Sequence, residues 1–407
     1  MKPSKLSVRD LAVAGKRIFV RVDFNVPLAG GAVADDTRVR ASLPTIELIL
    51  GRGGRVVLAS HLGRPKGRPN PAMGLGPVAA RLGDLLKRPV LMAEDCVGAA
   101  VEGRSRALKD GEVLLLENLR FHPEEEKNDA GFARQLAALG DLYVNDAFGS
   151  AHRAHASVEA ITKHVPVAAA GLLMDREIEM LGRLRDAPAR SYVAVLGGAK
   201  VSDKIELIES LLARVDAILI GGAMAYTFLK AAGTPTGGSR VEEDWIEVAR
   251  TITARAHTAS VRLLLPSDHV VAYSPEPGTP SRTTDGADIP DGFIGLDIGP
   301  KSRVAFAAEI RSAATVFWNG PVGLFEVSPY DAGTLAVASA ISASRAFSVV
   351  GGGDSIAAVT RLGLADRFSH LSTGGGASLE FLSGRELPGV VALTEASGAA
   401  PGRGRAE

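Results

Sequence analysis

The sequence predicts an α/β protein built from two doubly wound, mostly parallel sheets, that is, two Rossmann-like lobes. Short apolar runs alternate with longer amphipathic runs along nearly all of the 407 residues. The apolar runs are continuous, which is typical of parallel strands covered by helices on both faces. A chain of this length also exceeds the size at which one hydrophobic core stops growing, so we expect two domains.

Each predicted strand is a short apolar run, and most of these runs end in Gly, Asn, Asp, Ser or His. In the first half the strands are 17–24, 55–61, 112–118 and 141–148, and in the second half 192–198, 216–222, 262–268, 315–320 and 347–353. Helical periodicity lies between several of them, at 42–53, 131–140, 201–215 and 332–344.

The two halves are expected to join through a helix, because "GLLMDREIEMLGRLRDA" has helical periodicity and "APARS" ends it. We therefore predict a first lobe over 1–171, a connecting helix over 172–187 and a second lobe over 188–387. The tail 394–407 is small and polar without periodicity, so we expect it to be frayed.

Composition excludes several classes of protein. The chain has 46 basic and 46 acidic residues, so nothing overall favours a nucleic-acid or membrane partner. Its one cysteine excludes an intramolecular disulfide and a multi-cysteine metal site, and fits a reducing compartment. We find neither an apolar signal core nor an apolar stretch long enough to span a membrane. A cytoplasmic protein is the simplest interpretation, and nothing requires more than a monomer.

Basic side chains follow several strand ends in the first half, where open α/β sheets bind their ligands. These residues are His61, Arg64, Arg120 and Arg153. Arginine binds phosphate and carboxylate groups in a planar, bidentate way, so a convergent set would suit a small ligand carrying both. Any one arginine could equally be a solvated surface charge. The repeated placement is what favours a site.

Asp23 and Asn25 share one side of an extended segment, because alternate side chains point to the same face. Both could accept hydroxyl hydrogens from the same ligand, and Arg38 lies near a predicted helix start. Arg21 and Arg40 could instead be structural ion-pair partners.

Two other polar features of the first half have structural interpretations. His122 and His155 are open to surface or packing roles. We expect the run "PEEEK" (123–127) to be a solvated loop face.

The first glycine-rich strand end of the second half is "LGGAKVSDKI", which turns from strand to helix through Gly197 and Gly198. Lys200 and Lys204 are four residues apart, so on a helix they would share one face. Lysine suits phosphates as a mobile point charge, although an exposed helix face explains the pair as well.

Further glycine-rich ends include Gly295 in "GLDIGP" and the segment "FWNGPVGLFE". Glycine lets a flat ring or a phosphate approach the backbone closely. Asn319 and Glu326 could contact the edge of a ribose or a phosphate group. Trp318 is expected in the core rather than as a stacking platform.

The run "GGGDS" places Gly352, Gly353, Asp354 and Ser355 where a strand ends and a helix begins, although the chain has no G-x-x-x-x-G-K-[ST] loop. The N–H groups and dipole of the helix would favour phosphate oxygens. Asp354 could hold Mg²⁺ directly or through water, or it could simply be a helix N-cap. Ser355 could donate a hydrogen bond to a phosphate. A second glycine-rich turn, "STGGGASLE", could cradle a phosphoryl group.

At these residues the chain resembles the phosphoglycerate kinase family, over about residues 6–393. The motifs that carry the resemblance stand in the family's order: "RVDFNVP", "DDTRVRA", "SHLGRP", "ENLRF", "DAFGSAHRAH", "LGGAKVSDKI", "WNGPVGLFE", "GGGDS" and "STGGGASLEFLSGRELPGV". Ser355 stands where many members have Thr, which keeps the hydroxyl.

The resemblance implies two lobes joined by a helix around a cleft, with the C-terminal segment 388–400 returning to the first lobe. It also implies reversible Mg²⁺-dependent phosphoryl transfer from 1,3-bisphosphoglycerate to ADP, giving 3-phosphoglycerate and ATP. The implied 3-phosphoglycerate site is Asp23, Asn25, Arg38, His61, Arg64, Arg120 and Arg153. The implied nucleotide site is Gly197, Lys200, Lys204, Gly295, Asn319, Glu326, Gly352, Gly353, Asp354 and Ser355, with Asp354 at the metal.

Such a transfer needs no general base, because the acceptor in either direction is already an anion. We expect positioning and charge stabilisation by Arg38 and Lys200, with backbone donors at Gly375 and Gly376.

Two other classes of protein remain as alternatives. An anion-binding sensor predicts one ligand site, and a kinase for another acyl phosphate would not need a site rich in arginine.

Overall fold

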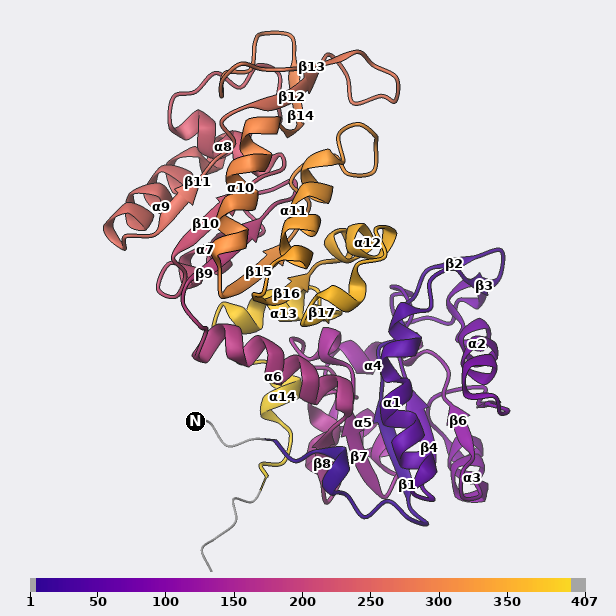
Figure 1. Ribbon diagram of the computed structural model, residues 1–407. Coiled ribbons are helices and arrows are strands. Elements are labelled where there is room, and N and C mark those ends of the chain that lie inside the picture. The colour runs from indigo at the N-terminus through magenta and orange to yellow at the C-terminus, as the bar shows by residue number, and fades with distance from the viewer. Residues whose placement is uncertain (1–4, 397–407) are drawn as a thin grey trace, which may run out of the picture. The chain divides into compact units, whose positions relative to one another are not determined.

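The computed structural model describes residues 5–396 and divides the chain into two compact units. The first comprises the described residues up to Glu179 together with those from Glu386 onward, and the second runs from Met180 to Arg385. Helix α6 (Leu172–Asp186) begins in one unit and ends in the other (Figure 1). Residues 397–400 of the expected returning segment, and the tail to 407, lie outside the described residues.

The first unit is built on a parallel sheet of order β5-β6-β4-β1-β7-β8. Its strands are β1 (Arg17–Arg21), β4 (Arg55–Ala59), β5 (Leu91–Met92), β6 (Val113–Leu115), β7 (Leu142–Asn145) and β8 (Ala168–Ala170). A small hairpin pairs β2 (Leu28–Ala29) with β3 (Ala32–Val33). The helices are α1 (Thr37–Gly51), α2 (Gly76–Leu86), α3 (Ala99–Ala107), α4 (Pro123–Glu126), α5 (Ala130–Ala137) and α14 (Pro388–Val391).

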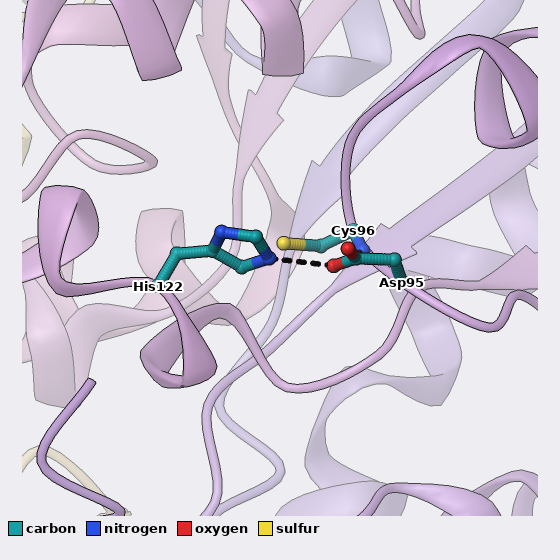
Figure 2. A group of neighbouring side chains, drawn as sticks. All are labelled: Asp95, Cys96 and His122. Carbon is teal, nitrogen blue, oxygen red and sulfur yellow. Dashed lines mark hydrogen bonds and ion pairs between the residues drawn. The ribbon is translucent and has the colours of Figure 1, made fainter. Parts of the chain in front are cut away.

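The inner residues of the central strands β1 and β4 are apolar and buried, as the sequence predicts for parallel strands. Ile18 and Val20 of β1 pack with Val56 and Leu58 of β4 in one hydrophobic core. The single cysteine, Cys96, lies just after β5 and is completely buried (Figure 2).

The C-terminal segment packs within the first unit. The backbone N–H of Leu6 donates to Thr394 O at 2.8 Å, and the N–H of Thr394 donates to Ala168 O at 2.9 Å. Lys5 Nζ donates to Glu395 Oε1 at 2.6 Å. These bonds join the two ends of the described chain to strand β8.

The second unit contains a parallel sheet of order β11-β10-β9-β15-β16-β17. Its strands are β9 (Tyr192–Leu196), β10 (Ala217–Ile220), β11 (Arg262–Leu264), β15 (Thr315–Asn319), β16 (Phe347–Gly351) and β17 (His370–Ser372). Its helices are α7 (Ile205–Leu211), α8 (Met224–Ala231), α9 (Ile246–Thr258), α10 (Pro300–Ser312), α11 (Ala332–Ala343), α12 (Gly353–Arg361) and α13 (Gly376–Leu382). Two parallel-sheet units confirm the predicted fold class.

An antiparallel sheet in the second unit was not predicted. It has the order β13-β12-β14, from Ser281–Thr283, His269–Ala272 and Ile294–Ile298. Strand β13 is exposed throughout, so it lacks the apolar run that marks a buried strand.

Trp318 is completely buried in the core of the second unit, as predicted, and its Nε1 donates to Gly320 O at 2.9 Å. Among residues 5–396, no helix combines the length and the apolarity that a membrane crossing requires.

Candidate functional site

The loops after four neighbouring strands carry the basic residues of the first unit. Strand β1 lies between β4 and β7, so the chain runs outward in both directions from it. Such a reversal of strand order leaves a crevice at the carboxyl ends of the strands, where ligands bind in open α/β sheets. The loops after β1, β4, β6 and β7 carry respectively Asp23 and Asn25, His61 and Arg64, Arg120, and Arg153.

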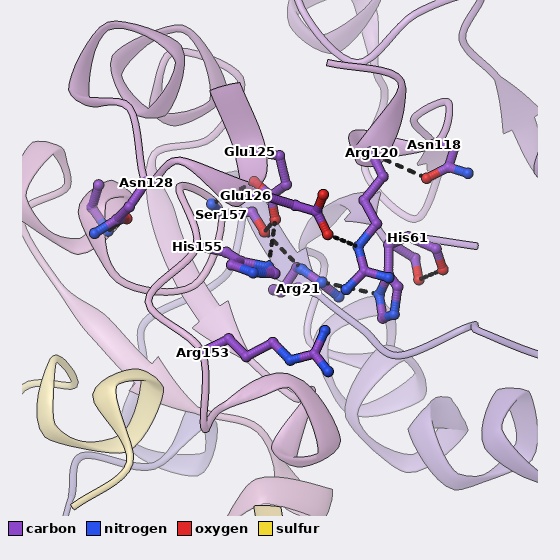
Figure 3. A network of polar contacts seen from close by, with 12 residues as sticks. Arg21, His61, Asn118, Arg120, Glu125, Glu126, Asn128, Arg153, His155 and Ser157 are labelled. Carbon is purple, nitrogen blue, oxygen red and sulfur yellow. Dashed lines mark hydrogen bonds and ion pairs between the residues drawn. The ribbon is translucent and has the colours of Figure 1, made fainter. Parts of the chain in front are cut away.

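A buried hydrogen-bond chain lies beneath these loops (Figure 3). Arg21 Nε donates to Ser157 Oγ at 2.8 Å, and the Ser157 hydroxyl donates to Glu125 Oε1 at 2.6 Å. The backbone N–H of Ser157 donates to Glu125 Oε2 at 2.9 Å. Buried charges are tolerated when they are paired and hydrogen-bonded in this way.

This chain corrects part of the expectation of a solvated loop face at 123–127, because Pro123, Glu126 and Lys127 are exposed but Glu125 is not. The segment forms α4, and the Glu125 side chain is completely buried. Burial raises the pKa of Glu125, while Arg21 and Ser157 act in the opposite direction. The charged run did not indicate that Glu125 is buried, because Arg21, whose charge stabilises the carboxylate, is distant in the sequence.

His61 connects the buried chain to the loops above it. Arg21 Nη2 lies 3.2 Å from His61 Nδ1, and His61 is buried. Burial lowers the pKa of His61 well below its ordinary value, and the positive charge of Arg21 acts in the same direction. The ring is therefore neutral at neutral pH. Because Nδ1 accepts from the Arg21 guanidinium, Nε2 carries the proton and can donate to a ligand.

Asp23 and Asn25 are fixed by the loops on either side of them. Asp23 Oδ1 lies 3.0 Å from Arg38 Nη1, at the start of α1. Although burial opposes it, the charges of Arg38 and Arg21 and the hydrogen bond from the backbone of Asn25 hold the pKa of Asp23 below its ordinary value. The N–H of Gly63 donates to Asn25 Oδ1 at 2.9 Å. These contacts tie the loop after β1 to α1 and to the loop after β4.

Arg120 is buried and points toward the same loops. Its Nη1 donates to Gly63 O at 2.8 Å, and its Nε lies 3.4 Å from Glu126. Burial lowers the pKa of Arg120, and the charges of Arg21 and Arg153 act in the same direction. Arg153 is half-buried and Arg64 is exposed. Hydrogen bonds and charge interactions thus connect all residues of the predicted 3-phosphoglycerate site except Arg64.

Four other polar residues of this half have structural roles. Arg40 forms an i,i+4 ion pair with Asp36, at 2.8 Å. His155 is buried with Nδ1 3.9 Å from Glu125, and burial lowers its pKa to about 3. Arg21 and Ser157 support the site from below. The sequence analysis missed this chain of hydrogen bonds. The signal that would have revealed it is the burial of Arg21 at the end of β1, and a sequence alone does not show burial.

In the second unit, two glycine-rich strand ends are in close contact. Strands β9 and β15 are neighbours at the point where the strand order reverses. The N–H of Gly197 donates to Asn319 O at 3.0 Å, and the N–H of Gly198 donates to Pro321 O at 2.8 Å. A Cβ on Gly197 would lie only 2.0 Å from Pro321 O, so no larger residue fits there without a shift of backbone.

Lys204 projects against the end of β15. Its Nζ contacts Asn319 Oδ1 and lies 3.3 Å from Asn319 O. Burial lowers the pKa of Lys204 to about 8, and the charges of Asp203 and Asp354 only partly oppose this. Lys204 and Asp354, from different strand ends, are therefore neighbours.

The two lysines do not share a helix face, contrary to the prediction. Helix α7 begins at Ile205, so Lys204 precedes it and Lys200 lies in the loop, exposed to solvent. The segment 201–204 forms turns, and Glu242 accepts hydrogen bonds from the N–H and hydroxyl of Ser202. This distant carboxylate, rather than local propensity, delays the start of the helix.

The "GGGDS" turn begins α12. Gly352 is the N-cap with φ +93°, a conformation that favours glycine, and Gly353 is the first residue of the helix. Asp354 is exposed in the first turn rather than at the N-cap. Ser355 is completely buried, and its Oγ accepts from the N–H of Gly320 at 2.7 Å. The Ser355 side chain therefore joins the ends of β15 and β16.

Four other predicted residues of the second unit lie at a helix start, in a loop and in a strand. Gly375, with φ +55°, is the N-cap of α13, and Gly376 is its first residue. Glu326 is exposed. Gly295 lies in β14, where a Cβ would be 2.1 Å from Tyr226 Oη. The contacts join Gly197, Lys204, Asn319 and Ser355 into one group.

The chain has two α/β units, and each carries polar and basic groups at the carboxyl ends of a parallel sheet. This arrangement is typical of α/β enzymes that bind anionic ligands at strand ends. A model of the family described as phosphoglycerate kinase matches residues 8–385. The chain belongs to the phosphoglycerate kinase family. Members of this family are glycolytic phosphotransferases that use ATP and ADP.

The similar proteins span nearly the whole chain. A phosphoglycerate kinase of Anaeromyxobacter dehalogenans is 57% identical over 95% of this chain and 98% of its own. One from Moorella thermoacetica is 56% identical over 96% of this chain and 100% of its own. The solved structure from Coxiella burnetii has a TM-score of 0.86 at 37% identity, covering 95% of this chain and 98% of that one. The structure from Pyrococcus horikoshii OT3 has a TM-score of 0.85 at 34% identity, with the same coverage.

Proposed function

We propose that the chain reversibly transfers a phosphoryl group from 1,3-bisphosphoglycerate to ADP, giving 3-phosphoglycerate and ATP. The observation that supports this most is the convergence of His61, Arg38 and Arg120 at the reversal point of the first sheet. Together they offer charged and neutral donors to an anion that carries both a phosphate and a carboxylate. Asp23 and Asn25 supply acceptors for its hydroxyl group.

The proposed nucleotide site is at the strand ends of the second unit. Gly197 and Gly352 allow the strand ends to pack closely, since a Cβ would lie 2.0 Å from Pro321 O at the first and 3.2 Å from Asn319 Nδ2 at the second. Lys204 and Lys200 supply positive charge. The remaining proposed contacts are Gly295, Asn319, Glu326, Gly353, Asp354 and Ser355. Since the Ser355 hydroxyl is already engaged with the Gly320 N–H, we assign this side chain to positioning the two strand ends.

The residues present fit a magnesium ion. Asp354 is an exposed carboxylate beside Lys204, and Mg²⁺ in nucleotide enzymes takes one or two carboxylates plus phosphate oxygens and waters. When bound, the ion would neutralise charge on the phosphates. Asp354 would hold it, and Lys204 would be kept charged by the phosphates beside it.

The proposed chemistry requires no general base, because the attacking oxygen in either direction is already an anion. Arg38 and Lys200 would stabilise the charge, with backbone N–H donors at Gly375 and Gly376.

The bound substrates must meet for transfer, so we propose that a closing motion about α6 brings their sites together and excludes water. Small-angle scattering checks this, since both substrates together should make the molecule more compact than either one alone.

We also propose that the enzyme is a cytoplasmic monomer organised as lobes 1–171 and 188–387 around a connecting helix 172–187, with 388–400 returning to the first lobe. A reducing compartment fits the single, buried cysteine. Sedimentation equilibrium should give the mass of one chain, 42.3 kDa.

The test of the proposed function is turnover of the purified chain with 3-phosphoglycerate, ATP and Mg²⁺, coupled to NADH-dependent reduction of the acyl phosphate. NADH consumption should require all three and should fall strongly in Lys200→Ala. The matched control is Lys230→Ala in α8, which should keep wild-type turnover. Calorimetric binding of both ligands without turnover would contradict the proposed chemistry, and absence of binding would contradict the site.

A further inference from the structure

Three side chains of different types converge outside the proposed active site, in the first unit. Asp95 and Cys96 follow β5, and His122 follows the short 3-10 helix Leu119–Phe121. A carboxylate oxygen of Asp95, Cys96 Sγ and a ring nitrogen of His122 all lie within 4.8 Å of one another. Figure 2 shows the thiol and the carboxylate both facing the Nε2 side of the imidazole.

The upper limit of 4.8 Å on these separations is longer than the ligand spacing of a loaded metal centre. A tetrahedral Zn²⁺ with bonds of about 2.0–2.3 Å holds its ligand atoms about 3.3–3.8 Å apart. His122 Nε2 and Asp95 Oδ1 are now hydrogen-bonded at 2.6 Å, so they need to separate slightly to admit an ion. Side-chain rotations would have to bring the ligand atoms around the ion, and Figure 2 shows that the three groups already lie beside one another.

The surroundings hold two of the groups in place. The N–H of Cys96 donates to Asp95 Oδ1 at 2.6 Å, which orients the carboxylate beside the thiol. The His122 ring stacks on Phe132 with ring centres 5.3 Å apart. A preformed arrangement lowers the entropy cost of ligation.

The cluster also has an entrance. A surface pocket of about 580 Å³ is lined by Asp95 and His122, and by the carboxylates of Glu94 and Glu117. Cys96 is completely buried and does not line this pocket. A cation would approach through this pocket, which Glu94, Asp95 and Glu117 line.

We propose that Asp95, Cys96 and His122 form a binding site for a zinc-class divalent cation. Thiolate sulfur and imidazole nitrogen favour Zn²⁺ or Co²⁺, whereas Mg²⁺ and Ca²⁺ prefer sites made only of oxygen. The site is distinct from the proposed Mg²⁺ position at Asp354, which belongs to the other unit. In the binding step the metal–sulfur bond forms while the S–H bond breaks and its proton passes to solvent. Burial raises the pKa of this thiol, so the ion has to displace the proton.

The test uses the purified full-length chain, treated with chelator and titrated with Co²⁺ in the absence of nucleotide. We expect one equivalent to produce a sulfur-to-cobalt charge-transfer band in the near ultraviolet, and Zn²⁺ to abolish it by displacement. The band should vanish in Cys96→Ser, and the Co²⁺ affinity should fall at least tenfold in His122→Asn and in Asp95→Asn. The matched control is His257→Asn, an exposed histidine of α9 in the other unit, which should leave the titration unchanged.

Unfolding curves establish that each variant is folded before it is titrated, and Asp95→Asn and His122→Asn provide the test if Cys96→Ser does not fold. Absence of the band in the wild-type chain would overturn the proposal. So would wild-type affinity in folded His122→Asn, or failure of Zn²⁺ to displace Co²⁺. Because no substrate is present, these outcomes are independent of the proposed kinase activity.

Discussion

Arg21 and Glu125 are buried in the first unit, and the hydroxyl of Ser157 joins them. The exposed fractions of the two charged residues are 1% and 0%. Neither can turn toward water if its partner is lost. The same guanidinium contacts His61, so this buried pair also fixes a residue of the proposed substrate site.

Ser157→Ala should therefore destabilise the fold. It removes one hydrogen bond from each of two buried groups, and leaving such groups unsatisfied costs about 1–3 kcal/mol each. Urea unfolding followed by circular dichroism gives the change. Ser312→Ala, on the exposed end of α10, is the control and should change stability by less than about 0.5 kcal/mol. Equal effects in the two variants would contradict the role of the buried chain.

Arg38→Ala should lower turnover by about 10²–10³-fold, the usual loss when a preorganised donor is removed. Arg38 is only half-buried and packs at a helix start, so the variant should remain folded. Coupled kinetics measure the loss. Arg40→Ala, two residues along α1, removes an ion pair with Asp36; it is the control and should keep nearly full activity. Near wild-type turnover in folded Arg38→Ala would remove this residue from the mechanism.

Nucleotide binding between pH 8 and 9 should take up a proton. Burial lowers the pKa of Lys204 to about 8, so the free enzyme loses this charge across that range. A bound phosphate would stabilise the charged form and raise the pKa again. Calorimetry of ADP binding in buffers of different ionisation enthalpy measures the uptake. Lys204→Arg is always protonated, so it should bind without uptake; equal uptake in both proteins would refute the assignment.

Stability should depend on pH through Asp297. Burial raises the pKa of this carboxyl group to about 7, although Gly333 N donates to it at 2.7 Å. The folded state therefore binds a proton that the unfolded state has released between about pH 4 and 7. This contribution is fully present below pH 4 and is lost, at about 1.4 kcal/mol per pH unit, as the pH rises to 7.

Asp297→Asn should remove that contribution. The difference in unfolding free energy between pH 5 and pH 7 should shift toward greater stability at pH 7, relative to the wild type. Denaturant titrations at the two pH values measure it. An unchanged difference would mean that Asp297 is ionised in the folded protein across this range.

Gly197→Ala should weaken ADP binding and destabilise the second unit. The new Cβ would meet the carbonyl oxygen of Pro321 at 2.0 Å, and backbone there must move, at a cost of about 1–3 kcal/mol. Calorimetry and urea unfolding measure the two effects. Gly286→Ala, where a Cβ has no neighbour within 4 Å, should be neutral in both. Wild-type ADP affinity in Gly197→Ala would show that the contact of the two loops does not shape the nucleotide site.

The sequence predicted the elements whose signal is local. Continuous apolar runs identified the central strands, because parallel strands must be apolar on both faces. Trp318 was correctly assigned to the core. The placement of basic residues after strand ends predicted which loops of the first unit face one another, since parallel strands bring their carboxyl ends to one edge.

Features that depend on distant partners were not predicted. Glu125 looked like a surface charge because Arg21 is a hundred residues away, and only the folded sheet brings them together. Lys204 was assigned to a helix that begins one residue later, because Glu242 holds the preceding turn open. The antiparallel strand β13 has no buried residue and so leaves no apolar pattern.

The burial of Cys96 has a practical consequence for measuring motion in this enzyme. It is the only thiol in the chain, and its sulfur is shielded from solvent. A thiol-reactive dye or spin label should therefore attach slowly to the wild type and rapidly to a cysteine introduced on the surface. Pairs of such cysteines, one in each unit, would report inter-unit distances during turnover without prior removal of a native residue.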